Sequence, residues 1–338
     1  MKLLITGGGG FIGARLARTL LARGELAGSK LERVVLADQV APPDELTRDP
    51  RVEARVGPLA AQCEALGRES FDGVFHLASA VSGECEADFD LGLRSNLDTT
   101  RALLDALRAA TGRGEAPAKL VFSSSVAIFG PDPSAALPDL VGDDTLPAPK
   151  TSYGTHKLIC EHLIADYSRK GYIDGRSARL MTVTVRPGRP NGAASSFFSG
   201  IIREPLAGEE AICPVSPEVS HPLTSVARTV EGLIAVFEAS IDAVGGRLGL
   251  NLPAVNVTVG QMLDALEAVA GKAVRERVRF VRDENIARIV ANWSRGCTAV
   301  RAGKLGLRAD PDFATIIRQY IADCRQSPNG AAALKGLT

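Results

Sequence analysis

Short apolar runs alternate with longer stretches of helical periodicity over the first half of the chain. The runs predict strands at residues 2–5, 33–37, 53–56, 73–77 and 119–124. Apolar positions three or four residues apart predict helices at residues 11–23, 89–110 and 153–169. Strands that are apolar on both faces and separated by helices are typical of a parallel sheet covered on both sides. The pattern therefore predicts an α/β fold with a Rossmann-like, doubly wound parallel sheet.

The pattern changes after a strand predicted at residues 181–186. Residues 187–225 are rich in Pro, Gly and Ser, and helical periodicity returns at residues 226–239, 259–270 and 314–324. We therefore expect a large sheet domain and a small lobe. The sheet domain would span residues 1–186, with about 226–255 returning to it. The lobe, mostly C-terminal, would span 187–225 and 256–326, followed by a frayed tail at 327–338.

Composition and charge narrow the classes of function. The chain has 338 residues, with 39 Lys and Arg against 39 Asp and Glu, and 5% aromatic residues. Zero net charge and few aromatic residues argue against a nucleic acid or an anionic membrane surface as a partner. No apolar run reaches the roughly 18 residues that a transmembrane helix needs. The glycines after Thr6 come too early for a signal peptide.

Cysteine and histidine spacing bears on the compartment and on metal binding. The six cysteines are scattered and include no Cys-x-x-Cys pair, which is typical of reduced thiols in a cytoplasmic protein. Among the four histidines, His156 and His162 are six positions apart, unlike the spacing of four found on zinc-binding helices. The sequence therefore predicts a cytoplasmic protein without a metal site.

A glycine-rich turn, residues 6–13, joins the first predicted strand to the first predicted helix. Gly7, Gly10 and Gly13 allow a tight turn, a close approach to a pyrophosphate and packing of the helix on the sheet. The free amides and the positive dipole end of the helix would then face the phosphates. In this context the motif predicts a dinucleotide site, and the alternative is a tight glycine turn without a ligand.

Asp38 follows the second long predicted strand. A carboxylate at this position can accept hydrogen bonds from an adenosine ribose and would repel a 2′-phosphate. Gln39 and Val40 come next, so no Arg or Lys follows to bind that phosphate. We therefore predict NAD rather than NADP, with a solvated loop carboxylate as the alternative.

A tyrosine and a lysine, Tyr153 and Lys157, are four positions apart and so share one helical face. A nearby ammonium group lowers the pKa of a phenol and favours the phenolate. A serine cluster, Ser123 to Ser125, ends a predicted parallel strand, where ligands bind in such sheets. Together these residues predict a catalytic centre, although a Tyr-x-x-x-Lys pair alone is common by chance.

With these motifs, the chain resembles the extended short-chain dehydrogenases/reductases, in the NAD-dependent epimerase/dehydratase family. The resemblance covers about residues 1–325 and implies an enzyme with Tyr153 as acid/base, Lys157 tuning its pKa and Ser125 binding the substrate hydroxyl. It also implies NAD as the cofactor. The implied cofactor-binding residues are Gly7, Gly10, Phe11, Ile12, Gly13, Asp38, Leu59, Leu77, Ala78, Ser79, Asn96, Tyr153, Lys157 and Pro187. Asn96 could equally be a structural asparagine, and His76 is expected to be a packing residue.

Three departures from the family pattern bear on the reaction. Dehydratases carry an Asp-Glu pair after the catalytic Ser/Thr, whereas Val126 and Ala127 stand here, which disfavours dehydration. Epimerases carry an arginine for a diphosphate in the stretch that here reads 220–226, without arginine. The third strand's Gly-Asp-Leu is here 57–59, Gly-Pro-Leu, so an adenine contact is lost.

The segment after residue 186 points to a small acid as substrate. Arg189 stands where epimerases carry a sugar-nucleotide asparagine, and an arginine can bind a carboxylate with two hydrogen bonds. The alternative is an arginine on the surface of the lobe. Residues 186–198 and 81–84 resemble the D-erythronate dehydrogenases of this family, which oxidise the C2 hydroxyl of a four-carbon sugar acid. The resemblance implies a substrate site of Ser82, Ser125, Tyr153, Arg189 and Asn191.

Two other functions stay open at this point. The first is a nucleotide-sugar 4-epimerase that uses bound NAD, and the second is a cofactor sensor without catalysis. Residues 89–110 and 153–169 look like the helix pair that forms the dimer interface of the family, so a homodimer is expected. Their apolar stripes are also compatible with packing on the sheet alone. Trp293 is predicted to be a packing residue, with a wall of the substrate pocket as the alternative.

Overall fold

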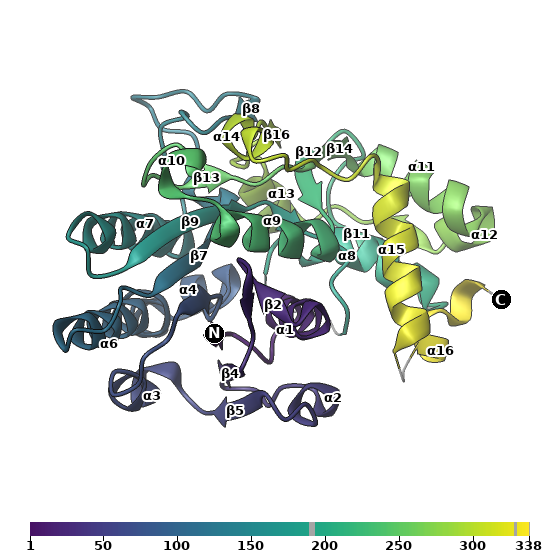
Figure 1. Ribbon diagram of the computed structural model, residues 1–338. Coiled ribbons are helices and arrows are strands. Elements are labelled where there is room, and N and C mark those ends of the chain that lie inside the picture. The colour runs from purple at the N-terminus through teal and green to yellow at the C-terminus, as the bar shows by residue number, and fades with distance from the viewer. Residues whose placement is uncertain (189–192, 328–329, 338) are drawn as a thin grey trace.

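A computed structural model describes residues 1–188, 193–327 and 330–337 of the chain (Figure 1). Its centre is a seven-stranded sheet in the order β13-β9-β7-β6-β1-β4-β5, in which every neighbouring pair is parallel. The strands are β1 (Lys2–Thr6), β4 (Arg33–Asp38), β5 (Val52–Val56), β6 (Gly73–His76), β7 (Lys119–Ser125), β9 (Asp174–Leu180) and β13 (Leu250–Asn251). This confirms the doubly wound α/β fold, with its change of direction between β1 and β6.

Helices cover both faces of this sheet (Figure 1). One face carries α3 (Leu59–Leu66), α6 (Thr99–Gly112) and α7 (Ser152–Arg169), whose leucines pack on buried residues such as Leu4 and Phe122. The other carries α1 (Phe11–Arg23) and α9 (Val226–Glu238), whose apolar stripes pack around Phe75. Because both faces are buried, the strands are apolar on both sides, as the sequence pattern indicated.

A second apolar core lies beside the sheet, toward the C-terminal half (Figure 1). It is built around three helices, α8 (Ser196–Leu206), α11 (Val259–Ala270) and α15 (Phe313–Gln326). A three-stranded sheet belongs with it, made of β10 (Thr182–Val183), β12 (Ser220–Thr224) and β14 (Val255–Thr258). Meanwhile α9 and β13 pack with the large sheet. The chain thus crosses between the two cores more than once.

Shorter elements connect these parts. The short helices are α2 (Asp44–Thr47), α4 (Ser82–Ala87), α5 (Phe89–Gly92), α10 (Ile241–Val244), α12 (Lys272–Arg275), α13 (Glu284–Val290), α14 (Val300–Lys304) and α16 (Gly330–Ala333). Two-stranded pairs are formed by β2 (Glu25–Leu26) with β3 (Ser29–Lys30), β8 (Leu140–Val141) with β16 (Gly296–Cys297), and β11 (Ala211–Cys213) with β15 (Val278–Phe280). Single 3-10 turns occur at η2 (Val126–Ile128) and η3 (Lys335–Leu337).

The sequence did not predict β9, the long strand beside β7, nor did it predict the shorter β12, β13 and β14. Only the two-residue β10 forms within the strand expected at 181–186. The strand that pairs with β7 is β9, which begins at Asp174, before the predicted segment. Strand β9 buries two arginines, which hides it from an apolar pattern. Arg179 pairs with Glu161 through two hydrogen bonds of 3.0 and 2.9 Å, and Arg176 donates to Ala239 O at 2.9 Å. Burial of these charges is tolerated because each is paired.

The long helix expected at 89–110 is interrupted. It comprises α5, a π-helical turn η1 (Leu93–Asp98) and α6. The wider turn places the Asn96 carbonyl where the Thr100 hydroxyl (2.5 Å) and the Cys160 thiol (3.5 Å) donate to it. Such turns inside helices are rare and leave no mark in apolar spacing, so the sequence could not predict this one.

The C-terminal end differs from the frayed tail that the sequence predicts. Residues 330–337 form α16 and η3, and Leu334 and Leu337 pack against the second core. Arg277 donates to Gly336 O at 3.1 Å. Across the described residues, no helix combines the length and the apolar character needed to cross a membrane. All six cysteines are free thiols and are buried.

Candidate functional site

The turn between β1 and α1 is shaped by close backbone contacts. Gly7 adopts φ +74° and its amide donates to Ala37 O at 2.8 Å. A Cβ atom at Gly13 would lie 2.1 Å from Gly7 O, so only glycine lets α1 start this close to the turn. Gly10 caps α1 without any side-chain hydrogen bond, which leaves the first amides of the helix for a ligand. This cradle fits a pyrophosphate.

Asp38 lies beside this turn, at the end of β4. Its Oδ2 accepts from the amide of Gly9 at 2.9 Å, and its Oδ1 accepts from the amide of Val40 at 3.2 Å. The carboxylate is therefore held against the glycine-rich turn and also lines the cavity described next. This is the position in which a ribose would meet it.

A single large cavity of about 1510 Å³ runs from this turn to the second core. Its size exceeds the roughly 300–1,000 Å³ of a pocket for one drug-sized ligand, which suits a dinucleotide together with a substrate. Its lining includes most of the residues predicted from the sequence: Gly7, Gly10, Phe11, Ile12, Gly13, Asp38, Leu59, Leu77, Ala78, Ser79, Ser82, Ser125, Tyr153 and Lys157. Asn96 and Pro187 lie outside this lining, and Arg189 and Asn191 fall outside the described residues.

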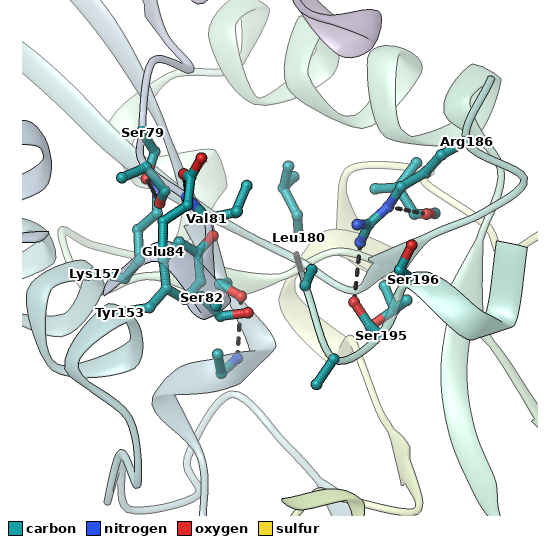
Figure 2. A pocket seen from close by; sticks show the side chains of 18 of the residues that line it. Ser79, Val81, Ser82, Glu84, Tyr153, Lys157, Leu180, Arg186, Ser195 and Ser196 are labelled. Carbon is teal, nitrogen blue, oxygen red and sulfur yellow. Dashed lines mark hydrogen bonds between the residues drawn. The ribbon is translucent and has the colours of Figure 1, made fainter. Parts of the chain in front are cut away.

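The three predicted catalytic residues all line this cavity, and Figure 2 shows Tyr153 and Lys157 on one side of it. Ser125 ends β7, and Tyr153 and Lys157 lie in the first turns of α7, whose start is capped by Thr151 (Gly154 N to Thr151 Oγ1, 3.1 Å). Lys157 Nζ donates to Ser123 O at 2.8 Å and lies 5.5 Å from the centre of the Tyr153 ring. Strand and helix thus bring a hydroxyl, a phenol and an ammonium together.

Burial and charge act in opposite directions on these groups. Burial raises the pKa of Tyr153, whereas a hydrogen bond with Ser125 and the positive charge of Arg186 lower it. Burial lowers the pKa of Lys157 to about 8. The net effect on Tyr153 is a raised pKa, so the phenol keeps its proton in this state, and Ser125 and Arg186 are the groups that favour its phenolate.

Asn96 has a supporting place rather than a cavity-lining one. Its Oδ1 accepts from the amide of Ala80 (2.7 Å) and the hydroxyl of Ser79 (3.1 Å), and its Nδ2 donates to Ala80 O at 3.2 Å. Three contacts therefore fix the segment after β6 that lines the cavity. This corresponds to the structural alternative that the sequence left open for this residue.

His76 ties β1 to α6 beneath the glycine-rich turn. Thr6 Oγ1 accepts from the amides of Leu77 and Ala78, so its own proton points to His76 Nδ1, 2.7 Å away. His76 Nε2 then donates to Thr100 Oγ1 at 2.9 Å. Burial, with a contribution from the charge of Lys157, lowers the pKa of His76 to about 3. It is a neutral packing residue, as the sequence predicts.

The far wall of the cavity comes from the second core. His221 on β12 accepts from Thr182 Oγ1 at 2.8 Å because its Nδ1 donates to Ser294 O at 3.2 Å. Its ring stacks on Phe198, with the ring centres 5.2 Å apart. Trp293 lies 5.1 Å from the same ring, and it both packs on the core and lines the cavity. Both interpretations of Trp293 therefore hold.

Burial of two neutral histidines predicts an acid-dependent loss of stability. The pKa is about 3 for His76 and about 4 for His221, both lowered mainly by burial. An unfolded histidine titrates near 6.5, so below that pH the unfolded chain binds more protons and the free energy of unfolding falls. We expect a loss of about 2 kcal/mol per histidine between about pH 6.5 and about pH 5.

Urea denaturation at several pH values measures this fall. His221→Gln should remove the contribution of His221 and leave those of His76 and of His156, whose pKa burial also lowers. His162→Gln, at an exposed position, should leave the fall unchanged. A pH dependence that is the same in wild type and His221→Gln would contradict the prediction.

Arg186 is the residue of this site that sequence reasoning missed. It follows β10 and lines the cavity, and its charge acts on Tyr153. The sequence did contain a signal for Arg186, because this residue begins the segment in which the family carries its substrate asparagine. The family pattern assigns substrate binding in that segment to Arg189 instead. Within the described residues, no group of three His, Cys, Asp or Glu side chains could hold a metal ion.

The model of the NAD dependent epimerase/dehydratase family matches residues 3–245 of the chain. The chain belongs to this family. NAD is therefore its cofactor, and the glycine-rich turn, the uncapped start of α1 and Asp38 fit that group. Two of the segments that depart from the family pattern can be placed in the structure. Residues 220–224, in the stretch without an arginine, form β12, and Leu59 of the Gly-Pro-Leu sequence begins α3 and lines the cavity.

Relatives of known activity cover nearly the whole chain. The D-erythronate dehydrogenase of Cupriavidus necator is 46% identical over 331 residues, 96% of this chain and 98% of that protein. The D-erythronate dehydrogenase of Haemophilus influenzae is 42% identical over 95% of this chain and 99% of that protein. A crystal structure described as a nucleoside-diphosphate-sugar epimerase from Agrobacterium tumefaciens aligns with a TM-score of 0.90 and 41% identity, covering 96% and 94% of the two chains.

Proposed function

We propose that this protein is an NAD-dependent dehydrogenase that oxidises the C2 hydroxyl of D-erythronate to give 2-dehydro-D-erythronate. The main support is the identity of 46% and 42% to two D-erythronate dehydrogenases over almost their full lengths. The cavity supplies the required groups, with Ser125, Tyr153 and Lys157 at its base and the NAD cradle at one end.

In this proposal the chain's own residues move the proton. Tyr153, as phenolate, removes the proton of the C2 hydroxyl, and Ser125 holds the same oxygen by a hydrogen bond. Lys157 stays beside the ring and favours the charged phenol. When bound, NAD accepts the hydride. Ser82 lines the same part of the cavity and is proposed to bind the substrate.

The proposal is tested by incubating the purified protein with NAD and D-erythronate and following NADH. The product is then identified by mass spectrometry as 2-dehydro-D-erythronate. A panel of UDP-sugars, assayed for isomerisation without net NADH formation, tests the 4-epimerase alternative. Turnover of a UDP-sugar together with no turnover of any four-carbon sugar acid would refute the dehydrogenase.

The domain and assembly predictions carry over as part of the proposal. The sheet of residues 1–186, joined by α9 and β13, would hold NAD, and the second core would hold the acid. We propose a cytoplasmic homodimer formed through α5, α6 and α7. Phe89 and Ile159 on these helices are 60% and 38% exposed, which supports a partner there. Light scattering measures the assembly directly.

Asp38 should set the preference for NAD over NADP. Its carboxylate would accept hydrogen bonds from the ribose and repel a 2′-phosphate at the same place. We expect wild type to prefer NAD by at least about 100-fold in kcat/KM, and Asp38→Ala to reduce that ratio by at least about tenfold. Asp44→Ala, on the exposed α2, is the matched control. An unchanged ratio in Asp38→Ala would place cofactor selection elsewhere.

A further inference from the structure

Arg186 lies on the opposite side of the pocket from the catalytic residues. Figure 2 shows it with Ser195 on one side and Ser82, Tyr153 and Lys157 on the other. All of these residues line the same cavity. A ligand that bridges the two sides would therefore meet a guanidinium at one end and the Tyr153 hydroxyl at the other.

The guanidinium is held in one orientation by its neighbours. Its Nε donates to Val183 O at 3.1 Å, and its Nη2 donates to Ser195 Oγ at 3.2 Å. The backbone is fixed as well, because the Arg186 amide donates to Ser199 Oγ (3.0 Å) and Arg203 Nη1 donates to Arg186 O (2.9 Å). Within the part of the chain that the structure describes, Nη1 has no hydrogen-bond partner. A preorganised donor is thus left for a ligand.

The charge of Arg186 also lacks a counter-ion among the described residues. The neighbouring cation, Arg203, forms an ion pair with Glu204, whereas no carboxylate of the described residues lies within ion-pair distance of Arg186. Burial and the charge of Arg203 lower the pKa of Arg186. A desolvated cation without a partner is unfavourable, and an anionic ligand would remove that penalty.

The other cations along the cavity do not compete for this role. Lys150 pairs with Asp132 at 3.3 Å, and Lys157 donates to a backbone carbonyl beside Tyr153. Arg94 is exposed and follows α5. Among the residues that the structure describes, the one unpaired guanidinium on this wall matches the single charge of a carboxylate rather than the two charges of a diphosphate.

We propose that Arg186 binds the carboxylate of the hydroxy-acid substrate through its free Nη1 and so places the adjacent hydroxyl at Tyr153 and Ser125. This rests on the proposed function and names the residue that selects an acid over a neutral polyol. It assigns to Arg186 the contact that the sequence gave to Arg189. Because the guanidinium also favours the phenolate, it links substrate selection to the reactivity of Tyr153.

The first test compares Arg186→Gln and Arg186→Lys with D-erythronate and its neutral amide, D-erythronamide. We expect Arg186→Gln to raise KM for D-erythronate by about 100-fold, as for loss of one partner of a desolvated charge pair, with less than about tenfold change in kcat. The KM for D-erythronamide should change by less than about threefold in Arg186→Gln. Arg186→Lys, or methylguanidinium added to Arg186→Gln, should restore part of the affinity for D-erythronate. Arg68→Gln, at an exposed position on the surface, is the matched control.

A binding measurement separates this inference from the proposed activity. In the Tyr153→Phe background, which blocks turnover, D-erythronate is titrated into the NAD complex and followed by the fluorescence of Trp293, the single tryptophan, which lines the cavity. Adding Arg186→Gln should weaken binding by about 100-fold. Arg186-dependent binding by a wild type that does not oxidise D-erythronate would refute the activity alone. Equal affinity with and without Arg186, no binding at all, or a loss seen only in Arg189→Gln would overturn the inference.

Discussion

Replacing Tyr153 by phenylalanine is expected to lower kcat for D-erythronate oxidation by at least about 1,000-fold, in the middle of the range for loss of a positioned general base. The substitution removes one oxygen atom and keeps the ring, whose centre lies 5.5 Å from Lys157 Nζ. Since the ring remains, the affinity for NAD should change by less than about threefold. Steady-state kinetics and calorimetric NAD titration measure the two quantities separately.

Tyr167→Phe provides the matched control for this prediction. Tyr167 lies on the same helix, α7, but its hydroxyl donates to Asp105 on α6 at 2.7 Å, away from the cavity. Its replacement should leave kcat within about twofold, because no reacting atom is near. If Tyr153→Phe kept more than about a tenth of the wild-type kcat, Tyr153 would not be the base.

The pH profile offers an independent check on the same residue. A hydrogen bond with Ser125 lowers the pKa of Tyr153. Removing it in Ser125→Ala raises that pKa, so the rising limb of log kcat/KM should move to higher pH. If the rising limb of log kcat/KM stayed in place or moved to lower pH, the hydrogen bond from Ser125 would not control the ionisation of Tyr153.

Much of the fold could be predicted from the sequence because the sheet is buried on both faces. The helix predicted at 11–23 is α1 and the one at 259–270 is α11, with identical bounds. Where burial depends on pairing instead of apolarity, prediction failed. Strand β9 carries Arg176 and Arg179 in the core. Asp174, two positions away, pairs with Arg176, but the carbonyl of Ala239 and the carboxylate of Glu161, which also hold these arginines, come from other parts of the chain. No local pattern records such partners.

In the candidate site as well, the residues that could be predicted belong to local motifs, and the others depend on contacts made by the folded chain. The glycine-rich turn and the Tyr-Lys pair are local, so their spacing alone predicted where they meet the cavity. The roles of Asn96 and Arg186 depend on the folded chain, because Asn96 holds Ala80 from the π-helical turn and Arg186 acts on Tyr153 of α7 from the segment after β10. The sequence shows an asparagine and an arginine at these positions, but only the folded structure shows what each side chain contacts.

Replacing Gly13 by alanine should give the largest loss of NAD affinity of any Gly→Ala substitution in this turn. The comparison is limited to glycines whose backbone angles alanine can adopt. The added Cβ would lie 2.1 Å from Gly7 O and 2.9 Å from Gly8 Cα. Both neighbours are backbone atoms, so no side chain can rotate away, and α1 must move outward from the turn. That movement separates the helix amides from the pyrophosphate.

We therefore expect Gly13→Ala to weaken NAD binding by at least about 100-fold, measured by calorimetry below its melting temperature. Thermal unfolding should show a lower Tm as well, because the clash lies between two packed elements. Gly112→Ala, where an added Cβ meets nothing within 4 Å, adds the same methyl at the end of α6 and should change neither quantity appreciably. Gly13→Ala binding NAD as wild type does would mean that the turn tolerates the displacement and that the amides of α1 do not hold the cofactor.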